Sequence, residues 1–369
     1  MVRRITSLTL RDIRSYQAFD AQLSGRSVVL TGPNGIGKTN LLEALTLFGA
    51  GRGLRGAKLS DIVRRGATGV PGAGMTLTDD ISDAQRLVVS IQPPRYDRRE
   101  VRIDGEPTRN ASALSAMVRF LWLTPAMDRL FVDAPSERRR FLDRFAAAGA
   151  PEHVAIAARY DKAMRQRMAL LDQDGDSALL AAFEAEMAEA GWSLTLARRE
   201  AVDALKSGYG AIREAAFPRA ELEIEGDLER WWRRGEPDVA ALFAERLARS
   251  RRVDRDARRT TIGPHRADLI VTHADKAMPA RLCSTGEQKA LLIGLVLARA
   301  WSARAAGAGA LVLLLDEIVA HLDEERRAAL AATLDTLGLQ AFLTGTDTEP
   351  FAAFLGAMDH LRPDPQSSG

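Results

Sequence analysis

The sequence contains a single cysteine, Cys283, in 369 residues. One thiol cannot form an intramolecular disulfide or a zinc cluster built on several cysteines, which excludes the disulfide-rich secreted and zinc-finger classes. Long apolar runs are also scarce. The longest, residues 306–315, stops at Asp316 and Glu317 and is too short to span a bilayer. No charged-then-apolar leader opens the chain, so we expect a cytoplasmic protein without membrane association.

The sequence also has no large excess of positive or negative charge. Basic and acidic residues number 51 and 49, a formal net charge of +2, so the chain as a whole has no strong field for a polyanion. Nearly all of the basic residues are arginine, which we attribute first to the base composition of a GC-rich genome and only second to phosphate binding. Local clusters must carry any argument for nucleic-acid binding.

The length suggests two domains, or one large α/β domain with an insertion. Near the N-terminus, strands are expected at residues 5–10, 27–31, 86–91 and 100–103, a helix at 38–48 and a surface loop at 70–74. In the middle, alanine-rich amphipathic patterns predict helices at 136–148, 152–171, 177–205 and 238–248, and a strand is possible at 221–224. Strands at 268–272, 311–315 and 340–343 and a long helix at 286–306 follow.

Continuous apolar runs such as residues 311–315 indicate strands that are covered on both faces. We therefore expect the two ends of the chain to form one sheet-based head from residues 1–111 and 260–362. Residues 112–259 are expected to form a mostly helical inserted arm of ordinary domain size, and residues 363–369 a flexible tail.

A phosphate-binding loop is the strongest motif. Residues 32–39 match G-x-x-x-x-G-K-[ST] between an apolar strand and a helix, which is the context that the motif requires. In such a loop, backbone N–H groups and the helix N-terminus face phosphate oxygens, the lysine reaches the β- and γ-phosphates, and the threonine hydroxyl binds Mg²⁺. The predicted nucleotide-binding residues are Gly32, Pro33, Asn34, Gly35, Ile36, Gly37, Lys38 and Thr39.

Two carboxylates end the apolar strand at residues 311–315. In phosphate-loop proteins an aspartate in this place holds Mg²⁺, which predicts Asp316 and Thr39 as metal-binding residues. The adjacent Glu317 can polarise a water for attack on the γ-phosphorus, and it is the predicted catalytic base. Solvated acids at a strand end are the alternative reading.

Residues 284–288, Ser-Thr-Gly-Glu-Gln, precede the long helix. Ser284 and Glu287 have capping-box spacing, so a well-capped helix start is one reading. A helix N-terminus with a serine hydroxyl and a bare glycine is also a second phosphate-binding surface, which adds Ser284, Gly286 and Glu287 to the predicted nucleotide-binding residues.

The order of these motifs resembles an ATP-binding-cassette (ABC) ATPase head, with Ala320 to Asp323 in the place of its D-loop and Thr344-Gly345-Thr346 where a switch histidine often lies. The residues within these motifs are similar to those of the bacterial RecF family of recombination proteins. They include Asn-Leu-Leu-Glu-Ala after the phosphate loop and Gly-Pro-His-Arg-Ala-Asp at residues 263–268. The fold implied is α/β: an ABC-type P-loop ATPase head with a mixed sheet and helices, plus the helical arm.

The resemblance implies an ATP- and Mg²⁺-dependent homodimer in which ATP joins two heads and slow hydrolysis separates them. It also implies binding to gapped DNA or to junctions of single- and double-stranded DNA, RecR and RecO as partners, and help in loading RecA. Two departures stand out. Residues 120–125 carry no glutamine near the lobe junction, and threonine replaces the switch histidine.

Two other functions remain open. The energising subunit of a membrane transporter is disfavoured by the missing glutamine and by the 246 positions between Lys38 and Ser284. A nucleotide-gated scaffold without its own DNA contact is the second. The insertion is much too short for the long coiled-coil arms of chromosome-maintenance proteins.

Several segments have two readings. Gly263-Pro264-His265 is either a rigid turn or an element that positions a lobe or senses nucleotide. The tryptophans at 231–232 either pack or stack on bases. Arginine clusters are either solvated or bound to DNA phosphates: residues 246–259, 138–140, 64–65 and 52/55. The remaining histidines show no ligand spacing, so no transition-metal site is expected.

Overall fold

A computed structural model describes residues 3–49, 51–79, 84–108, 111–150, 152–173, 175–212, 216–306, 309–352, 354, 356 and 358–364. The chain forms two compact units. The first unit comprises Met1–Asp128, Gly210–Phe217 and Val296–Gly369, and the second comprises Arg129–Tyr209 and Pro218–Leu295.

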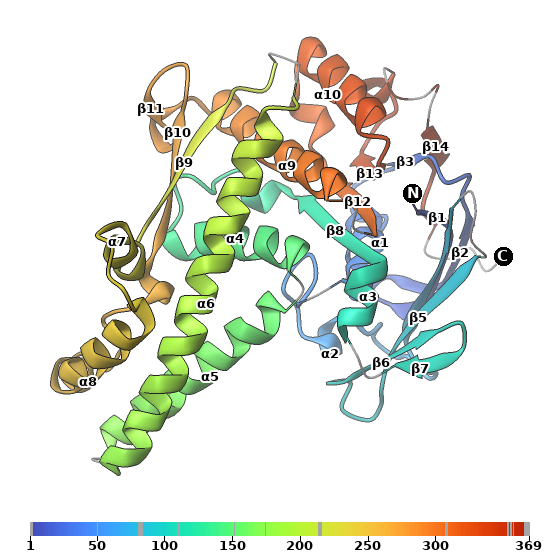
Figure 1. Cartoon of the computed structure of the whole chain (residues 1–369). Coiled ribbons are helices and arrows are strands. Elements are labelled where there is room, and N and C mark those ends of the chain that lie inside the picture. Colours follow the sequence, from blue (N-terminus) through green and yellow to red (C-terminus); the bar gives the residue numbers. More distant parts are fainter. Residues whose placement is uncertain are drawn as a thin grey trace. The chain divides into compact units, whose positions relative to one another are not determined.

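The first unit contains an antiparallel sheet of six strands in the order β2-β1-β4-β5-β6-β7 (Figure 1). Its strands are β1 (Arg4–Ile13), β2 (Tyr16–Gln22), β4 (Gly72–Thr78), β5 (Gln85–Ile91), β6 (Arg99–Ile103) and β7 (Glu106–Thr108). Ile5, Leu8 and Leu10 of β1 are buried in one hydrophobic core, and the strand register shifts between Ile5 and Ser7. The sheet thus packs one face against the rest of the unit.

A second sheet in the first unit is parallel and joins the two ends of the chain in the order β14-β3-β13-β12-β8. Its strands are β3 (Ser27–Thr31), β8 (Val118–Leu123), β12 (Ala310–Leu315), β13 (Gln340–Gly345) and β14 (Met358–Leu361). All residues of β12 and β13 are buried, as expected for strands covered on both faces. The helices of this unit are α1 (Lys38–Leu45), α2 (Leu59–Ile62), α3 (Ala111–Met117), α10 (Glu324–Leu337) and the C-terminal half of α9 (Thr285–Ala305).

The second unit is mostly helical. It contains α4 (Pro135–Gly149), α5 (His153–Asp172), α6 (Ser177–Tyr209), α7 (Asp227–Arg233), α8 (Val239–Ala257) and the first half of α9. A small antiparallel sheet, β11-β10-β9, completes it: β9 (Ala220–Glu225), β10 (Asp268–His273) and β11 (Met278–Pro279). Tyr160, Met187, Phe243 and Leu247 from α5, α6 and α8 are the centre of its core. These helices present their apolar stripes to one another.

The units divide the chain differently from the expected boundaries at 111/112 and 259/260. The strand β10, expected in the head, pairs instead with β9, from Asp268–Glu225 to His273–Ala220, and so belongs to the second unit. The cause is the alternating pattern of β9, which buries Leu222 and Ile224 and needs a partner strand. Of the expected tail, residues 365–369 lie outside the described residues.

The expected surface loop at residues 70–74 was wrong, because Gly72–Thr78 forms β4 between β1 and β5. The two glycines that suggested a loop are required by close packing. A Cβ atom at Gly72 would lie 2.6 Å from the Val89 carbonyl oxygen, and one at Gly74 would lie 2.6 Å from Oγ1 of Thr9. Glycine inside a strand often marks such an approach.

Candidate functional site

The phosphate-loop sequence forms a tight turn between β3 and α1 in the first unit. Gly37, the residue before α1, has φ 106°, a left-handed conformation that favours glycine. A Cβ atom there would also lie 2.8 Å from the hydroxyl of Tyr16 and 2.9 Å from Oγ of Ser15. The Tyr16 hydroxyl donates to the Gly37 carbonyl oxygen at 3.0 Å. The first residue of β2 therefore contacts the end of the phosphate loop.

Lys38 lies over this loop. Its ammonium donates to the carbonyl oxygens of Gly32 at 2.7 Å and Pro33 at 3.2 Å, and it lies 3.7 Å from Oε1 of Glu317. The side chain is only 4% exposed, so its aliphatic part is packed and its charge is held in one place. A fixed cation beside the N-terminus of α1 suits phosphate oxygens.

Asp316, at the end of β12, meets the first residues of α1 although the two are far apart in sequence. Oγ1 of Thr39 donates to the Asp316 carboxylate, with both oxygens at 3.0 Å. Burial raises the pKa of Asp316, while the hydroxyls of Thr344 and Thr39 oppose this shift. A buried carboxylate next to a hydroxyl offers the hard oxygen ligands that Mg²⁺ prefers, so Thr39 and Asp316 fit the predicted metal site.

Thr344, at the C-terminal end of β13, holds both of the predicted acids. Its hydroxyl donates to Oδ1 of Asp316 at 2.8 Å and accepts the backbone N–H of Glu317 at 2.8 Å. The Glu317 side chain is 34% exposed, so it can reach a water. The first unit therefore brings together Lys38, Thr39, Asp316 and Glu317.

A buried ion pair next to the loop was missed at the level of sequence. Glu43 in α1 is 1% exposed and accepts two hydrogen bonds from Arg14, at 2.7 Å and 2.9 Å. Nη1 of Arg55 lies 3.3 Å from the same carboxylate and donates to Oδ1 of Asn40 at 3.0 Å. The only sequence signal was an acidic residue inside an apolar helical run, which predicts a buried partner but does not identify it.

The Ser-Thr-Gly-Glu-Gln segment belongs to the second unit, so the first unit forms its site without it. The capping box is formed here. Oε2 of Glu287 accepts the Ser284 backbone N–H and the Ser284 hydroxyl, each at 2.9 Å. Lys276 pairs with the same carboxylate and, together with Ser284, lowers the pKa of Glu287 to about 2. The Ser284 donors are thus engaged by an ionised carboxylate.

The Gly-Pro-His segment is a structural element of the second unit. Because the Thr260 carbonyl oxygen can only accept, Nε2 of His265 carries the proton and donates to it at 3.0 Å. Nδ1 then accepts the Tyr160 hydroxyl at 2.7 Å. Burial lowers the pKa of His265, in keeping with a neutral ring. Arg198 donates to the Pro264 carbonyl oxygen at 2.7 Å, and every contact named here stays within this unit.

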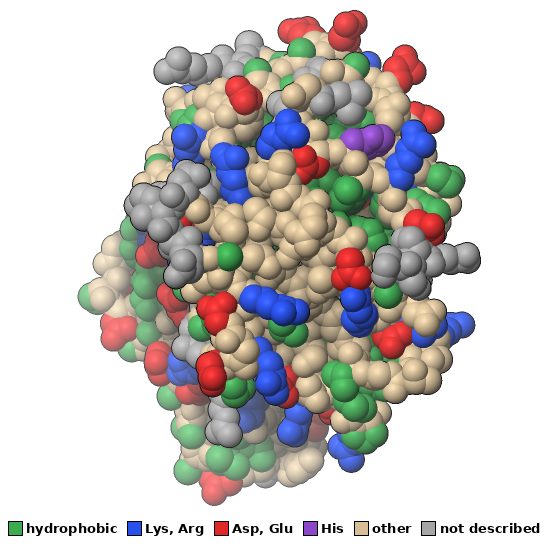
Figure 2. Space-filling model, turned by 90° about the vertical axis from the view of Figure 1, so that its right-hand side faces the viewer, with side chains coloured by type: hydrophobic (Ala, Val, Ile, Leu, Met, Phe, Trp, Pro, Cys, Tyr) green, Lys and Arg blue, Asp and Glu red, His purple; other side chains and the backbone are tan. Residues whose placement is uncertain are grey.

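The arginine clusters contain members that hold the fold and members that lie exposed at the surface. Arg138 binds the Asp268 carboxylate through two bonds of 2.8 Å, and Arg64 contacts Asp12 at 2.7 Å, so these side chains hold the fold. Exposed arginines lie along α8 and just after it: Arg246, Arg249, Arg252, Arg255, Arg258 and Arg259. One of them, Arg249, pairs with Glu245. On the face seen in Figure 2, basic and acidic side chains are interspersed, and neither sign forms a continuous patch.

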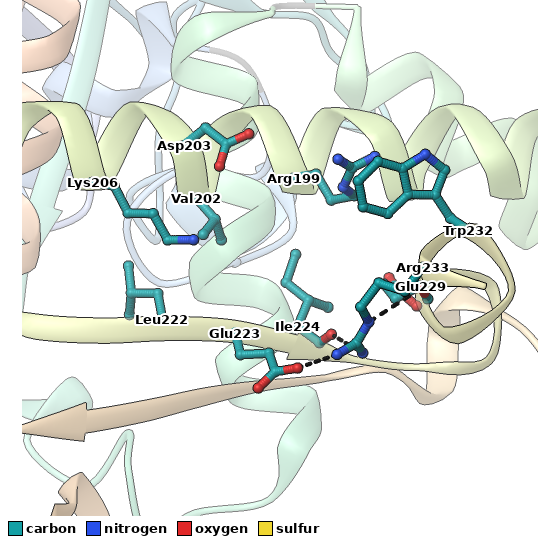
Figure 3. A pocket seen from close by; sticks show the side chains of 10 residues that line it. All are labelled: Arg199, Val202, Asp203, Lys206, Leu222, Glu223, Ile224, Glu229, Trp232 and Arg233. Carbon is teal, nitrogen blue, oxygen red and sulfur yellow. Dashed lines mark hydrogen bonds and ion pairs between the residues drawn. The ribbon is translucent and has the colours of Figure 1, made fainter. Parts of the chain in front are cut away.

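The two neighbouring tryptophans have different surroundings. Trp231 packs against Phe243 in the core of the second unit, with ring centroids 6.3 Å apart. Trp232 is 42% exposed, and the guanidinium of Arg199 lies 3.2 Å from the centroid of its ring. Both Trp232 and Arg199 line a cavity of about 280 Å³ bounded by α6, α7 and β9 (Figure 3). Packing therefore accounts for Trp231, whereas Trp232 lies at the surface.

In the part of the chain that the structure describes, no helix combines the length and the apolar character needed to cross a membrane. The family described as "RecF/RecN/SMC N terminal domain" matches residues 4–357. The DNA replication and repair protein RecF of Rhizobium etli (strain CIAT 652) is 46% identical over 352 residues, 95% of this chain and 94% of the relative. That of Caulobacter vibrioides is 44% identical over 371 residues, covering 97% and 94%.

Among solved structures, the recombination mediator protein RecF-ATPrS in the RecFOR pathway is similar, with a TM-score of 0.80, 22% identity, and 95% of this chain and 94% of that chain covered. An Smc head domain from Pyrococcus furiosus matches with a TM-score of 0.51 and 15% identity, over 95% of this chain and 92% of that one. At these identities the structures establish the fold alone. The expected ABC-type head is confirmed, with its antiparallel and parallel strands in two separate sheets.

Proposed function

The chain belongs to the RecF family of DNA replication and repair proteins, and from this premise we propose that it is an ATP-switched dimer that acts on DNA during recombinational repair. The single observation that supports the switch is the convergence of Lys38, Thr39, Asp316 and Glu317 in the first unit. These residues form one site for a nucleoside triphosphate and for the water that hydrolyses it.

Each residue has a separate task in this proposal. The loop amides and Lys38 bind the β- and γ-phosphates of ATP, and Glu317 accepts a proton from the attacking water. Thr39 and Asp316 would hold Mg²⁺, which when bound neutralises charge that develops on the phosphates. Turnover is expected to be slow, because hydrolysis ends a conformational state and does not supply a metabolic product.

The Ser-Thr-Gly-Glu-Gln segment contributes from a second copy of the chain. Ser284 and Gly286 at the start of α9 would face the γ-phosphate held by the partner, so ATP joins two subunits. Since Glu287 accepts both Ser284 donors, the phosphate would replace this carboxylate as their acceptor. Binding energy that exists only while the γ-phosphate is present makes the dimer a switch.

DNA is the proposed macromolecular ligand. Family membership supports binding to gapped DNA or to junctions of single and double strands, cooperation with RecR and RecO, and assistance in RecA loading. Among the exposed arginines, Arg252 and Arg255 lie three residues apart in the last turns of α8, which places them on one side of the helix, and Arg259 follows just after the helix ends at Ala257. They are the proposed phosphate contacts. The relatives are DNA replication and repair proteins, which disfavours the alternative that this chain is the ATPase subunit of a membrane transporter.

The switch is tested with two variants. Glu317→Gln is expected to bind ATP normally and to accumulate ATP-dependent dimers in light scattering, because hydrolysis is blocked. Ser284→Arg is expected to bind nucleotide with unchanged affinity and to remain monomeric. Equal monomer fractions with and without ATP in the Glu317 variant would refute the switch, and loss of nucleotide binding in the Ser284 variant would refute the role in trans.

The DNA assignment has its own test. A gel shift with gapped DNA is expected to show ATP-dependent binding whose affinity falls steeply with salt. If the ATP-bound dimer forms but leaves gapped DNA unshifted at low salt, the protein is a nucleotide-gated scaffold and the DNA contact is wrong.

A further inference from the structure

Thr344 occupies the place where ATPases of the transporter type carry a histidine, and its hydroxyl is directed at the protein itself. The residue is fully buried, at 0% exposure, at the end of β13. Its one hydroxyl proton goes to Oδ1 of Asp316, and its oxygen accepts the backbone N–H of Glu317, both at 2.8 Å. A hydroxyl has one donor and two acceptor positions, so this arrangement uses the proton and one lone pair.

The second bond holds a backbone conformation that a side-chain-bearing residue seldom adopts. Glu317 has φ 53°, in the left-handed region. Such a residue persists only where its surroundings fix it, and these residues cluster at active sites. The bond from the Glu317 N–H to Thr344 closes the turn after β12, and this turn sets the direction in which the Glu317 carboxylate leaves the backbone.

The Glu317 carboxylate points toward Lys38, whose ammonium lies 3.7 Å from Oε1 of Glu317. The first bond of Thr344 fixes the Asp316 carboxylate, which Thr39 also contacts at 3.0 Å. One buried hydroxyl thus bonds to the Asp316 carboxylate and to the Glu317 backbone at once. A small misplacement of a reacting group can cost a large factor in rate.

We propose that Thr344 is a positioning residue. Its hydroxyl orients Glu317 for the attack of water on the γ-phosphate and fixes the position of the Asp316 carboxylate. This inference rests on the proposed ATPase function. It assigns Thr344 no contact with nucleotide. Replacement of the hydroxyl should therefore impair hydrolysis and leave nucleotide binding intact.

The test compares Thr344→Val, which keeps the shape and loses both bonds, with Thr344→Ser, which keeps the hydroxyl. In Thr344→Val, we expect kcat to fall about 10- to 100-fold, a part of what a positioned general base contributes, with KM and the equilibrium affinity for ATP within about twofold of wild type. Thr344→Ser is expected to restore most of kcat. ATP-joined dimers of Thr344→Val should also persist longer in light scattering after free ATP is removed.

A matched control separates position from stability. Thr333 in α10 is 1% exposed and donates to the Ala329 carbonyl oxygen at 2.7 Å, so Thr333→Val exchanges the same buried groups away from the site. It should retain wild-type kcat. If Thr344→Val does not fold, Thr344→Cys, with a weak donor and acceptor, takes its place beside Thr344→Ser.

The outcomes distinguish the two levels of inference. Wild-type kcat in folded Thr344→Val, or equal losses in the Val and Ser variants, would overturn the role of Thr344 while Glu317→Gln is still impaired. A loss of affinity for ATP measured without Mg²⁺ in Thr344→Val would show a contact with nucleotide and overturn it as well. Wild-type hydrolysis by Glu317→Gln would instead remove the proposed base itself.

Discussion

Arg167 in α5 is a fully buried charge of the second unit, and replacing it with methionine perturbs three helices together. Its side chain has 0% exposure. It donates to Glu184 of α6 at 3.0 Å, to Asp254 of α8 at 2.7 Å and to the Leu247 carbonyl oxygen at 2.7 Å. Methionine fills most of the volume but leaves two buried carboxylates without this cation.

The size of the effect follows from what remains. Removing one partner of a buried ion pair costs about 3–5 kcal/mol, because the other charge stays buried. Here Arg251 still contacts Glu184 at 2.6 Å, and the backbone N–H of Thr261 still donates to Asp254 at 2.8 Å. We therefore expect the lower end, about 3 kcal/mol. With a urea m value of about 2 kcal/mol/M, the unfolding midpoint falls by about 1.5 M.

Tryptophan fluorescence during urea unfolding measures this shift. Trp192, Trp231 and Trp232 lie in the second unit and Trp122 and Trp301 in the first, so emission reports mainly on the second. Arg159→Met is the matched control in the same helix.

The control is informative because Arg159 is exposed. It pairs with Glu186 at 2.8 Å, with the two side chains 46% and 39% exposed, and solvent-exposed pairs of this kind contribute little to stability. A loss of unfolding free energy below 1 kcal/mol for Arg167→Met, or equal losses for the two variants, would refute the reasoning that the buried contacts of Arg167 stabilise the packing of these helices.

Three further predictions concern charge. Glu287→Gln keeps an acceptor for Ser284 and removes a negative charge from the proposed γ-phosphate site, so light scattering should detect ATP-dependent dimers at several-fold lower ATP; an unchanged or higher ATP requirement contradicts this. Replacing Arg252 and Arg259 together with alanine should lower the slope of log affinity against log salt by about 2 in DNA titrations, and an unchanged slope excludes them as phosphate contacts. Burial raises the pKa of Glu229, whose carboxylate oxygens have no hydrogen-bond partner among the described residues. Glu229→Gln should thus stabilise the second unit at pH 7 by about 1–3 kcal/mol, and the gain should vanish as pH falls below the ordinary carboxyl pKa, where both folded and unfolded states are protonated; a pH-independent difference in unfolding midpoint contradicts it.

The parts of the fold that sequence predicted well have local signals. β3 and β12 were predicted to within a residue, because a continuous apolar run ends in a motif with fixed geometry. β4 was missed because its glycines suggest a loop, and only the neighbouring strands show why glycine is needed. The pairing of β10 with β9 was also missed, since register between distant segments depends on packing and not on either segment alone.

The same division holds at the candidate site. The motifs predicted Lys38, Thr39 and Asp316, because phosphate and metal binding demand these residue types at these spacings. The double role of the Thr344 hydroxyl has no spacing rule, since it depends on two adjacent parallel strands that end at the same level. The contact of Arg14 with Glu43 likewise joins a turn to a helix across 29 positions, and many other pairings would satisfy the same composition.

The distribution of hydrogen-bond donors between the two units bears on the order of events in the proposed switch. The cation Lys38 donates to neutral carbonyl oxygens of its own loop and lies 3.7 Å from Oε1 of Glu317, whereas the uncharged Ser284 is bonded directly to an ionised carboxylate. A phosphate is attracted by Lys38 and can displace its neutral carbonyl acceptors, whereas at Ser284 it must replace the Glu287 carboxylate, which repels it. Nucleotide should therefore bind first to the phosphate loop of one subunit, and exchange at Ser284 should follow on dimerisation. This order requires nucleotide affinity to be independent of protein concentration in Ser284→Arg and to rise with protein concentration in the wild type, since only the wild type gains the second contact.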